Sequence, residues 1–481
     1  MQRREFINAM APGAASLGLT PAAAAAERPN IIMILADDLG YGDLGCYGQK
    51  LIKTPNLDRM AAEGLRFTQF YSGNTVCAPS RCVLMTGQHM GHCHVRGNAE
   101  TDMLVQSLRQ SDVTVAEVLK SAGYATALIG KWGLGEIDQP GHPLRKGFDT
   151  FYGYLNQVHA HNYWPDFLWR NREQVKLPNV VKPAERAYGG FRGGVSTKRV
   201  QYSPDLIANE ALAWIEKQKN NSFFLYLAPT LPHANNEWTS GIGHGAEIPD
   251  YGIYAKQNWP DPDKGQAAMV SRLDRDVGRV LDRLASLGLT EKTLVLFTSD
   301  NGPHMESGNN PPLFNPAGPL RGMKRDLLEG GIRVPFLASW PGRIQPGQVS
   351  DHVGYFGDLM ATVCDLTGSA LPPNRDSVSF LPALRGERTR QRQHDYLYWE
   401  FYEGGSAQAV RWGKWKGIRS PMFTGTIQLY DLSFDPGEKY NVARGHADVV
   451  KQIEAIMARA HTPHPNWKTG DSPRVSTPRK P

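Results

Sequence analysis

One cysteine of this chain stands in a setting that could make it reactive. Residues 77–81 read CAPSR. Because Pro79 suits the first turn of a helix, Cys77 is predicted to lie just before a helix N-terminus, where backbone N–H groups favour negative charge. Arg81 comes one helical turn later and can face the same site. On this stretch alone, an ordinary buried cysteine is the simpler interpretation.

Two pairs of oxygen-bearing side chains follow apolar runs. Asp37-Asp38 ends the first such run of the chain, and Asp300-Asn301 ends a later one. Either pair alone would fit a turn or a helix cap. Together they favour a shared site, and a set of oxygen ligands calls for a hard cation.

Two basic side chains occupy similar places. Lys131 follows the apolar run 125–129, and His233 follows the run 223–228. A lone lysine is more often a solvated surface residue, and a lone histidine is more often structural than catalytic. The position of Lys131 at the end of a buried strand favours a place at a site.

These residues need a scaffold, and the apolar runs predict one. Continuous runs typical of strands covered on both faces are residues 31–36, 125–129, 223–228, 293–298 and 334–340. Helical patterns lie between them at residues 55–63, 114–121, 204–217 and 266–287. This alternation predicts an α/β domain, with its chemistry at the carboxyl ends of the strands. Residues 170–199 and 235–264 are predicted to be long loops that form lids or pocket walls.

Four segments are predicted along the chain. Residues 1–26 resemble a twin-arginine export signal, because Arg3-Arg4 precedes a modest apolar stretch and a run of alanines at 22–26. A catalytic domain at 27–370 and a C-terminal antiparallel-sheet subdomain at 371–465 follow, the latter with strands at 397–401, 409–418 and 427–432 and a helix at 447–460. Residues 466–481 are expected to be a disordered tail.

Composition restricts the remaining function classes. The formal net charge of +6 is compatible with an anionic substrate but does not require one. No basic run is long enough for a nucleic-acid arm, and no segment has the length of a membrane span. The five cysteines are odd in number, so at least one stays unpaired within the chain.

Taken together, the motifs resemble those of the type I sulfatases, which belong to the alkaline phosphatase superfamily. Residues 77–81 with Thr86-Gly87 resemble the sulfatase signature. The other matching motifs, in chain order, are Asp37-Asp38, Gly130-Lys131-Trp132, Pro232-His233, Asp300-Asn301-Gly302, Gly322-Met323-Lys324 with residues 329–335, and residues 429–432 with Asp435-Pro436 and Asn441. The resemblance covers nearly the whole mature chain.

The resemblance implies both a fold and a nucleophile. The fold is an alkaline phosphatase-like α/β sandwich with a central, mostly parallel sheet, plus a small C-terminal α+β domain with an antiparallel sheet. Cys77 would be oxidised to Cα-formylglycine by a formylglycine-generating enzyme, and the aldehyde hydrate would attack sulfur. The hydrate keeps a second hydroxyl after sulfation, so loss of that proton expels sulfate and regenerates the aldehyde.

The resemblance also assigns roles. Lys131 and Lys324 would bind the sulfate group and stabilise its negative charge. His233 would protonate the departing alcohol, and Arg81 would orient the hydrate at residue 77. The implied metal is calcium, with magnesium compatible with the same donors. Its ligands would be Asp37, Asp38, residue 77 as the hydrate, Asp300 and Asn301.

The chain departs from the family pattern at one position. Many members carry a histidine two residues after the first lysine, as the base for sulfate elimination, whereas this chain has Gly133. Elimination then needs no strong base, or another residue substitutes, or the protein is catalytically impaired. His304, close in sequence to Asp300, is the candidate substitute.

The predicted function is hydrolysis of sulfate monoesters, with a sulfated carbohydrate as substrate and a periplasmic or secreted location. The alternatives are a phosphodiester or phosphonate monoester hydrolase with the same fold and nucleophile, and a catalytically weak binder of sulfated glycans. A cluster of aromatic and basic side chains could stack on a sugar ring, but packing between loops explains it equally well. Its members are His159, His161, Tyr163, Trp164, Trp169 and Arg170.

Overall fold

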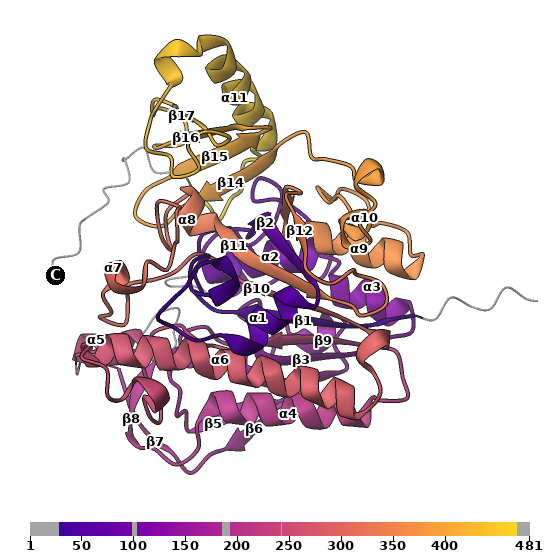
Figure 1. Cartoon of the computed structure of the whole chain (residues 1–481), viewed down its shortest axis with the longest axis vertical. Coiled ribbons are helices and arrows are strands. Elements are labelled where there is room, and N and C mark those ends of the chain that lie inside the picture. The colour runs from indigo at the N-terminus through magenta and orange to yellow at the C-terminus, as the bar shows by residue number, and fades with distance from the viewer. Residues whose placement is uncertain (1–27, 99–102, 185–192, 242, 469–481) are drawn as a thin grey trace, which may run out of the picture.

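A large mixed sheet forms the centre of the molecule (Figure 1). The structure, a computed structural model, describes residues 28–98, 103–184, 193–241 and 243–468. The predicted export signal at 1–26 lies outside the described residues, as does the predicted tail from residue 469 onward. Along the sheet the strands are β12 (Gln348–Ser350), β2 (Leu65–Tyr71), β11 (Arg333–Ser339), β10 (Thr293–Ser299), β1 (Asn30–Ala36), β9 (Phe223–Ala228), β3 (Ala125–Lys131), β4 (Thr150–Tyr154), β5 (Phe167–Arg170) and β6 (Glu173–Lys176), and β13 (Gly354–Tyr355) pairs with β2.

The five central strands run parallel, and four of them, β10, β1, β9 and β3, correspond to apolar runs that predicted parallel strands, whereas the fifth such run, at residues 334–340, falls on the antiparallel strand β11. β10, β1, β9, β3 and β4 form consecutive parallel pairs, so Met33 lies between Leu296 and Tyr226. β11 runs antiparallel to β10 and to β2, and β5 and β6 close the other edge with antiparallel pairs. The expected α/β fold with a mostly parallel centre is confirmed.

Helices cover both faces of this sheet, which is why β1 is apolar from Ile31 to its end. Ile31, Met33 and Leu35 face one core, which holds residues of α2 (Cys77–Thr86), α3 (Val115–Ser121) and α9 (Asp358–Thr367). Ile32 and Ile34 face the other core, which is shared with α1 (Pro55–Ala62), α4 (Ser203–Lys217) and α6 (Asp261–Ser286). Successive side chains of a strand point to opposite faces, so one strand contributes to both cores.

The C-terminal part builds a second sheet, at the top of Figure 1. β14 (Leu397–Phe401), β15 (Ala407–Trp412), β16 (Trp415–Arg419) and β17 (Gln428–Asp431) pair in order as antiparallel neighbours. α11 (Ala447–Ala460) packs on this sheet through Ile453 and Ile456, which contact Val410 and Leu429 in one cluster. The antiparallel sheet and its helix are therefore as expected.

Several predicted boundaries are wrong. The single strand expected at 409–418 is a hairpin, because Gly413 adopts a φ of 58° between β15 and β16. The loop expected at 170–199 contains β6 and the hairpin of β7 (Val180–Pro183) with β8 (Gly194–Lys198). The loop expected at 235–264 contains α5 (Asn236–Gly241) and the first turn of α6.

The ends of the predicted subdomain also differ. Phe380, beyond the predicted boundary at residue 370, packs edge-on against Phe67 and Phe336 of the main sheet. Trp467, inside the expected tail, donates its indole N–H to the carbonyl of His94. The core of the main domain thus extends past residue 370, and ordered chain extends to Lys468.

The two sheets are joined by buried ion pairs. Lys416 of β16 lies 2.9 Å from Glu329 and 3.2 Å from Glu438, and all three side chains are buried. Removing one partner of such a cluster leaves an uncompensated buried charge, so the contact tolerates little change.

In the described part of the chain, no helix is both long enough and apolar enough for a bilayer crossing. All five cysteines are free thiols.

Candidate active site

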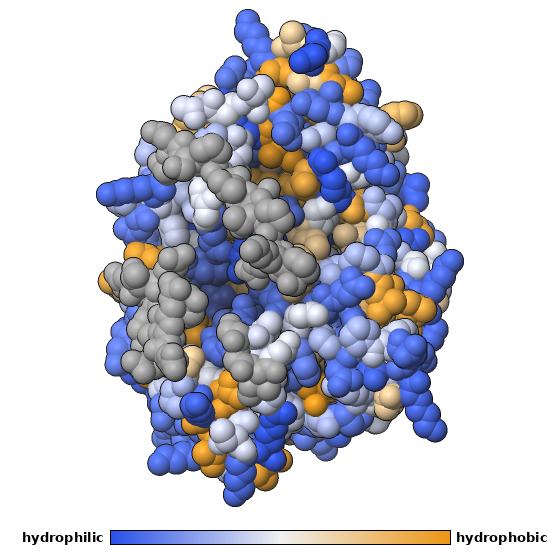
Figure 2. All heavy atoms as spheres, turned by 90° about the vertical axis from the view of Figure 1, so that its left-hand side faces the viewer, coloured by the Kyte–Doolittle hydropathy of each residue, from blue (hydrophilic) through white to orange (hydrophobic). Residues whose placement is uncertain are grey.

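The predicted site residues meet at the carboxyl ends of the parallel strands. β1, β3, β9 and β10 end toward the left of Figure 1, and Figure 2 shows that face hollowed and lined by hydrophilic residues. Cys77 reaches the same point from α2. It is the first residue of that helix, with Val76 as the N-cap, rather than the residue before it.

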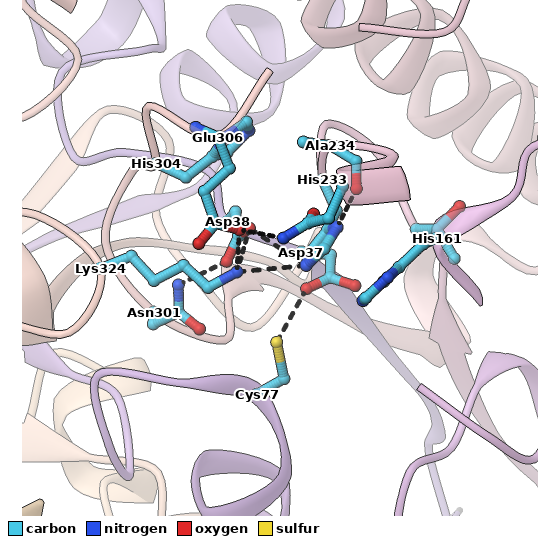
Figure 3. Close-up of polar contacts among 12 residues, drawn as sticks. Asp37, Asp38, Cys77, His161, His233, Ala234, Asn301, His304, Glu306 and Lys324 are labelled. Atoms are coloured by element: carbon cyan, nitrogen blue, oxygen red, sulfur yellow. Dashed lines mark hydrogen bonds and ion pairs between the residues drawn. The ribbon is translucent and has the colours of Figure 1, made fainter. Parts of the chain in front are cut away.

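Asp37 links the cysteine to a lysine (Figure 3). The thiol of Cys77 donates to Asp37 Oδ1 over 3.4 Å, and Lys131 Nζ donates to Asp37 Oδ2 over 2.6 Å. Burial alone would raise the pKa of Asp37, but Lys131, His233 and Arg81 hold it well below its ordinary value. Burial raises the pKa of the Cys77 thiol well above its ordinary value, so the unmodified side chain is a poor nucleophile.

The second pair of predicted ligands joins the first directly. The backbone N–H of Asp38 donates to Asp300 Oδ1 over 3.1 Å, and Asn301 Nδ2 donates to Asp38 Oδ1 over 2.7 Å. Asp38 has a φ of 66°, a strained conformation for a residue with a side chain. Burial and the nearby Asp37 raise the pKa of Asp300 to about 7.

These donors fit a hard divalent cation. Asn301 Oδ1 is buried and, among the described residues, has no hydrogen-bond partner, although its own amide nitrogen is satisfied. Ligand atoms of Asp37, Asp38, Cys77 and His233 lie within 4.8 Å of one another. Carboxylate oxygens and an unpartnered amide oxygen are the ligands that such an ion takes. His233, in contrast, is held by hydrogen bonds to Lys324 and to the carbonyl of Ala234.

Arg81 holds the acids that flank residue 77. Its Nε and one terminal nitrogen donate to Asp300 Oδ2 over 3.2 and 2.8 Å, and the other donates to the carbonyl of Lys131 over 2.9 Å. The terminal nitrogen that donates to Asp300 also lies 3.5 Å from Asp37 Oδ2. Arg81 therefore contacts the acids on either side of residue 77, and Cys77 is not among these partners.

Two buried lysines bind the two adjacent aspartates, Lys131 at Asp37 and Lys324 at Asp38. Burial alone would lower the pKa of Lys131, but Asp37 raises it above its ordinary value. Lys324 Nζ contacts three groups: Asp38 Oδ2 at 2.8 Å, Glu306 Oε2 at 3.0 Å and His233 Nε2 at 3.1 Å. Both ammonium groups are thus positioned to bind an anion in front of residue 77.

His233 has a defined orientation. Its Nδ1 lies 2.6 Å from the carbonyl of Ala234, so Nδ1 carries the proton and Nε2 accepts from Lys324. Burial and then Lys324 lower the pKa of His233 well below its ordinary value. The imidazole of His233 therefore accepts a hydrogen bond from the ammonium group of Lys324, and Figure 3 draws this contact as a dashed line between the two side chains.

The hypothesis that His304 is the elimination base is wrong. Its Nε2 donates to the carbonyl of Pro232 over 3.0 Å, and its Nδ1 accepts from the backbone N–H of Glu306 over 3.0 Å. Both ring nitrogens are thus used in fixing a loop. Although His304 is close in sequence to Asp300, neither of its ring nitrogens is free to act at the site.

Two residues that the structure places at the site were not predicted as site residues. Glu306 binds Lys324 and Arg325, and no motif in the sequence indicates it. His161 stacks on His233 with ring centroids 4.9 Å apart and 14° between the planes. Its sequence signal was the cluster of aromatic and basic side chains, for which packing was an equal explanation.

Comparisons with known proteins agree with this geometry. The sequence model of the sulfatase family matches residues 29–369, and that of the C-terminal part of N-sulphoglucosamine sulphohydrolase matches residues 323–462. The N-acetylgalactosamine-6-sulfatase of Homo sapiens is 35% identical over 479 residues, covering 91% of this chain and 86% of that protein.

A bacterial relative and a solved structure are also similar. The N-acetylgalactosamine-6-O-sulfatase of Bacteroides thetaiotaomicron is 30% identical over 510 residues, covering 91% of this chain and 94% of that protein. The crystal structure of Ps i-CgsB in complex with k-i-k-neocarrahexaose has a TM-score of 0.76 and 27% sequence identity, covering 92% of this chain and 95% of that one.

Proposed function

The chain belongs to the sulfatase family and is a sulfuric ester hydrolase, and from that premise we propose that it removes sulfate from a sulfated carbohydrate. One observation carries the proposal. Cys77, the oxygen donors of two strand ends and the ammonium groups of Lys131 and Lys324 form one buried cluster. Such a cluster fits a tetrahedral anion held beside a nucleophile.

Residue 77 acts after modification. Cys77 Sγ stands where the hydrate oxygens of Cα-formylglycine would lie, and a formylglycine-generating enzyme is the maturation partner. The hydrate supplies a nucleophilic oxygen and a second hydroxyl whose proton is lost when sulfate departs. The family resemblance and the raised pKa of the thiol support this assignment, because the buried thiol itself is a weak nucleophile.

The metal in this proposal is calcium. Asp37, Asp38, Asp300 and Asn301 would hold it together with residue 77, and magnesium suits the same oxygen donors. When bound, the ion would supply positive charge beside residue 77 and act as a Lewis acid toward the sulfate group. The unpartnered Asn301 Oδ1 supports the assignment.

The remaining side chains divide the work of ester cleavage. Lys131 and Lys324 bind the sulfate oxygens, and Arg81 fixes Asp300 and Asp37 around residue 77. His233 Nε2 faces Lys324 Nζ at 3.1 Å, so the leaving oxygen can take a proton from this pair. A sugar alcohol is a poor leaving group, so this proton matters more for a saccharide than for an aryl sulfate.

Similar proteins support a carbohydrate as the substrate class. The relatives above are named as sulfatases of N-acetylgalactosamine, and the structure of Ps i-CgsB holds a carrahexaose. The comparisons name sulfatases, and they do not favour a phosphodiester or phosphonate monoester hydrolase. A weak glycan binder would retain saccharides without releasing sulfate.

The decisive experiment measures sulfate release from a panel of defined sulfated saccharides. Protein with formylglycine at residue 77, verified by mass spectrometry of the tryptic peptide, is compared with the Cys77→Ala variant. We expect sulfate release from at least one saccharide by the first protein and none by the second. Faster cleavage of an aryl phosphodiester than of any sulfate ester would refute the proposal.

The proposed location is the periplasm or the exterior, supported by Arg3-Arg4 and the alanine run at 22–26. Replacement of both arginines by lysine should leave the precursor in the cytoplasm. Normal export of that variant would contradict a twin-arginine signal.

A further inference from the structure

A carboxylate–histidine pair borders the site on the side away from Lys324. His161 Nδ1 lies 3.1 and 3.2 Å from the two carboxylate oxygens of Glu237. Figure 3 shows the ring of His161 pointing toward the space in front of Asp37 and His233. The side chain of His161 is 16% exposed and that of Glu237 is 8% exposed, so the pair faces the site rather than bulk solvent.

The hydrogen bond to Glu237 determines which ring nitrogen of His161 can accept a hydrogen bond from a ligand. Glu237 accepts the proton of Nδ1, so in the neutral ring Nε2 is an acceptor. Among the described residues, His161 Nε2 has no hydrogen-bond partner, and it lies at the end of the ring that points into the site. A ring held by a buried carboxylate and aimed at an open space is organised for a ligand that donates a hydrogen bond.

Two other members of the cluster of aromatic and basic side chains are held by contacts within the protein. The hydroxyl of Tyr163 lies 2.8 Å from the carbonyl of Thr230 and 2.6 Å from that of His233, which ties Tyr163 to the loop that carries His233, and Trp164 packs under the guanidinium of Arg199. His161, in contrast, stacks parallel to His233, with one ring nitrogen bound to Glu237 and the other turned to the site.

The place of His161 beside His233 indicates which part of the substrate can contact it. His233 stands beside the bond that is cleaved, and the centroid of His161 is 4.9 Å from that of His233. A group that contacts His161 Nε2 therefore belongs to the leaving alcohol, close to the ester oxygen. The sulfate itself has its charged partners, Lys131 and Lys324, on the other sides.

We propose that His161 Nε2 accepts a hydrogen bond from a hydroxyl group of the sugar ring that carries the sulfate, and that Glu237 is the positioning residue that orients the imidazole. This inference rests on the proposed function and specifies its substrate. It makes the pair a determinant of the preference for saccharides over leaving groups without a hydroxyl.

The test compares two substrates on matched variants. One substrate is the saccharide that wild type cleaves fastest in the panel above, and the other is 4-nitrophenyl sulfate, whose leaving group has no second hydroxyl. The variants are His161→Ala, His161→Gln and Glu237→Gln. His446→Ala is the control, since His446 also packs against an aromatic ring, Trp415, at a centroid distance of 4.8 Å, but in the C-terminal sheet domain.

We expect His161→Ala to lower kcat/KM for the saccharide about tenfold or more, the usual effect of losing one hydrogen bond to a buried partner, and to change that for 4-nitrophenyl sulfate less than about twofold. His161→Gln should recover part of the loss, because its amide oxygen can accept from the same hydroxyl. Glu237→Gln should fall between wild type and His161→Ala, and His446→Ala should match wild type on both substrates.

Three results would overturn the inference. Equal losses on both substrates would place His161 in sulfate transfer itself, and unchanged kinetics in His161→Ala would leave it no substrate contact. Wild type that cleaves 4-nitrophenyl sulfate but no saccharide would also overturn it. Wild type that cleaves neither substrate would refute the proposed function, and this inference with it. A thermal unfolding curve for each variant shows that the compared proteins are folded.

Discussion

The substitution Asn301→Asp tests the metal site most directly. In the structure Asn301 Nδ2 donates to Asp38 Oδ1 over 2.7 Å and to the carbonyl of Gly302 over 2.9 Å. A carboxylate at this position replaces both donors by an oxygen. Without metal, the new charge repels Asp38, whereas with metal it adds a charged ligand.

The cost without metal follows from Coulomb's law. Two like charges about 4 Å apart at an effective dielectric constant of about 20 repel by roughly 4 kcal/mol. For a chain of 481 residues, with an unfolding entropy near 2.1 cal/mol/K per residue, this lowers Tm by about 4 °C. The loss is largest above neutral pH, where the introduced carboxyl group is ionised.

The assay is thermal unfolding at pH 8 in EDTA and in calcium chloride. Wild type should gain stability with calcium, by about 2.7 kcal/mol when the free ion is at 100 times its Kd. Asn301→Asp should melt below wild type in EDTA, and calcium should raise its Tm by more than it raises that of wild type. Asn441→Asp makes the same chemical change at an exposed position and should behave as wild type in both buffers.

Two outcomes would refute this reasoning. Equal Tm values for wild type and Asn301→Asp in EDTA would mean that the introduced carboxylate does not repel Asp38. A wild type that calcium and magnesium both fail to stabilise would mean that the oxygen cluster is not a metal site. Direct measurement of bound metal after dialysis separates weak binding from the absence of binding.

Three further predictions use other parts of the structure. Lys324→Met should lower kcat by roughly 100-fold or more, as loss of one oxyanion-stabilising group does, while Lys414→Met at an exposed ion pair should not change steady-state kinetics. Burial raises the pKa of Glu438 to about 7, so between about pH 4.5 and 7 the unfolded chain releases this proton while the folded protein keeps it, and the stability of wild type falls as pH rises. The stability of Glu438→Gln relative to wild type should therefore increase from pH 5 to pH 7 in urea unfolding, and a constant difference would contradict the assignment. Gly133→His should lower the free energy of unfolding by about 1–2 kcal/mol because residue 133 has a φ of 79°, which strains a residue with a side chain. The new side chain also meets Gln157, so the double variant with Gln157→Ala should recover the loss caused by that contact but not the loss caused by φ, as read from Tm.

The centre of the fold was predictable because each strand carries its own local signal. β1, β9 and β10 are buried along their whole length, and a continuous apolar run indicates that condition directly. β2 alternates buried and half-buried residues and lies near the edge, so its pattern LRFTQFY is weaker. Its place in the sheet is set by pairing with β11, more than 260 residues away, which no local pattern reports.

The same distinction applies to the site. Cys77, Asp37 and Lys131 were predictable because each belongs to a motif with a fixed place after a strand or in a helix. Glu306 and His161 lie in connecting segments whose path depends on tertiary packing. His304 failed as a candidate for the converse reason, because nearness in sequence says nothing about which backbone groups its ring nitrogens contact.

Position 133 shows what the chain does with the space that a histidine takes in many relatives. A Cβ atom on Gly133 would lie 2.9 Å from Gln157 Cγ, so the side chain of Gln157 fills this space. Gln157 Nε2 donates to Asn98 Oδ1 over 2.9 Å, and the same oxygen accepts the backbone N–H of Ala78, next to residue 77.

Neither amide can take up a proton near neutral pH. With both nitrogens of His304 occupied, the titratable group in contact with residue 77 among the described residues is Asp37, whose Oδ1 lies 3.4 Å from Cys77 Sγ. Its pKa is held well below the ordinary value, so it is a weak base. Sulfate is a good leaving group and needs little help from a base, so elimination in this chain can proceed without an imidazole at position 133.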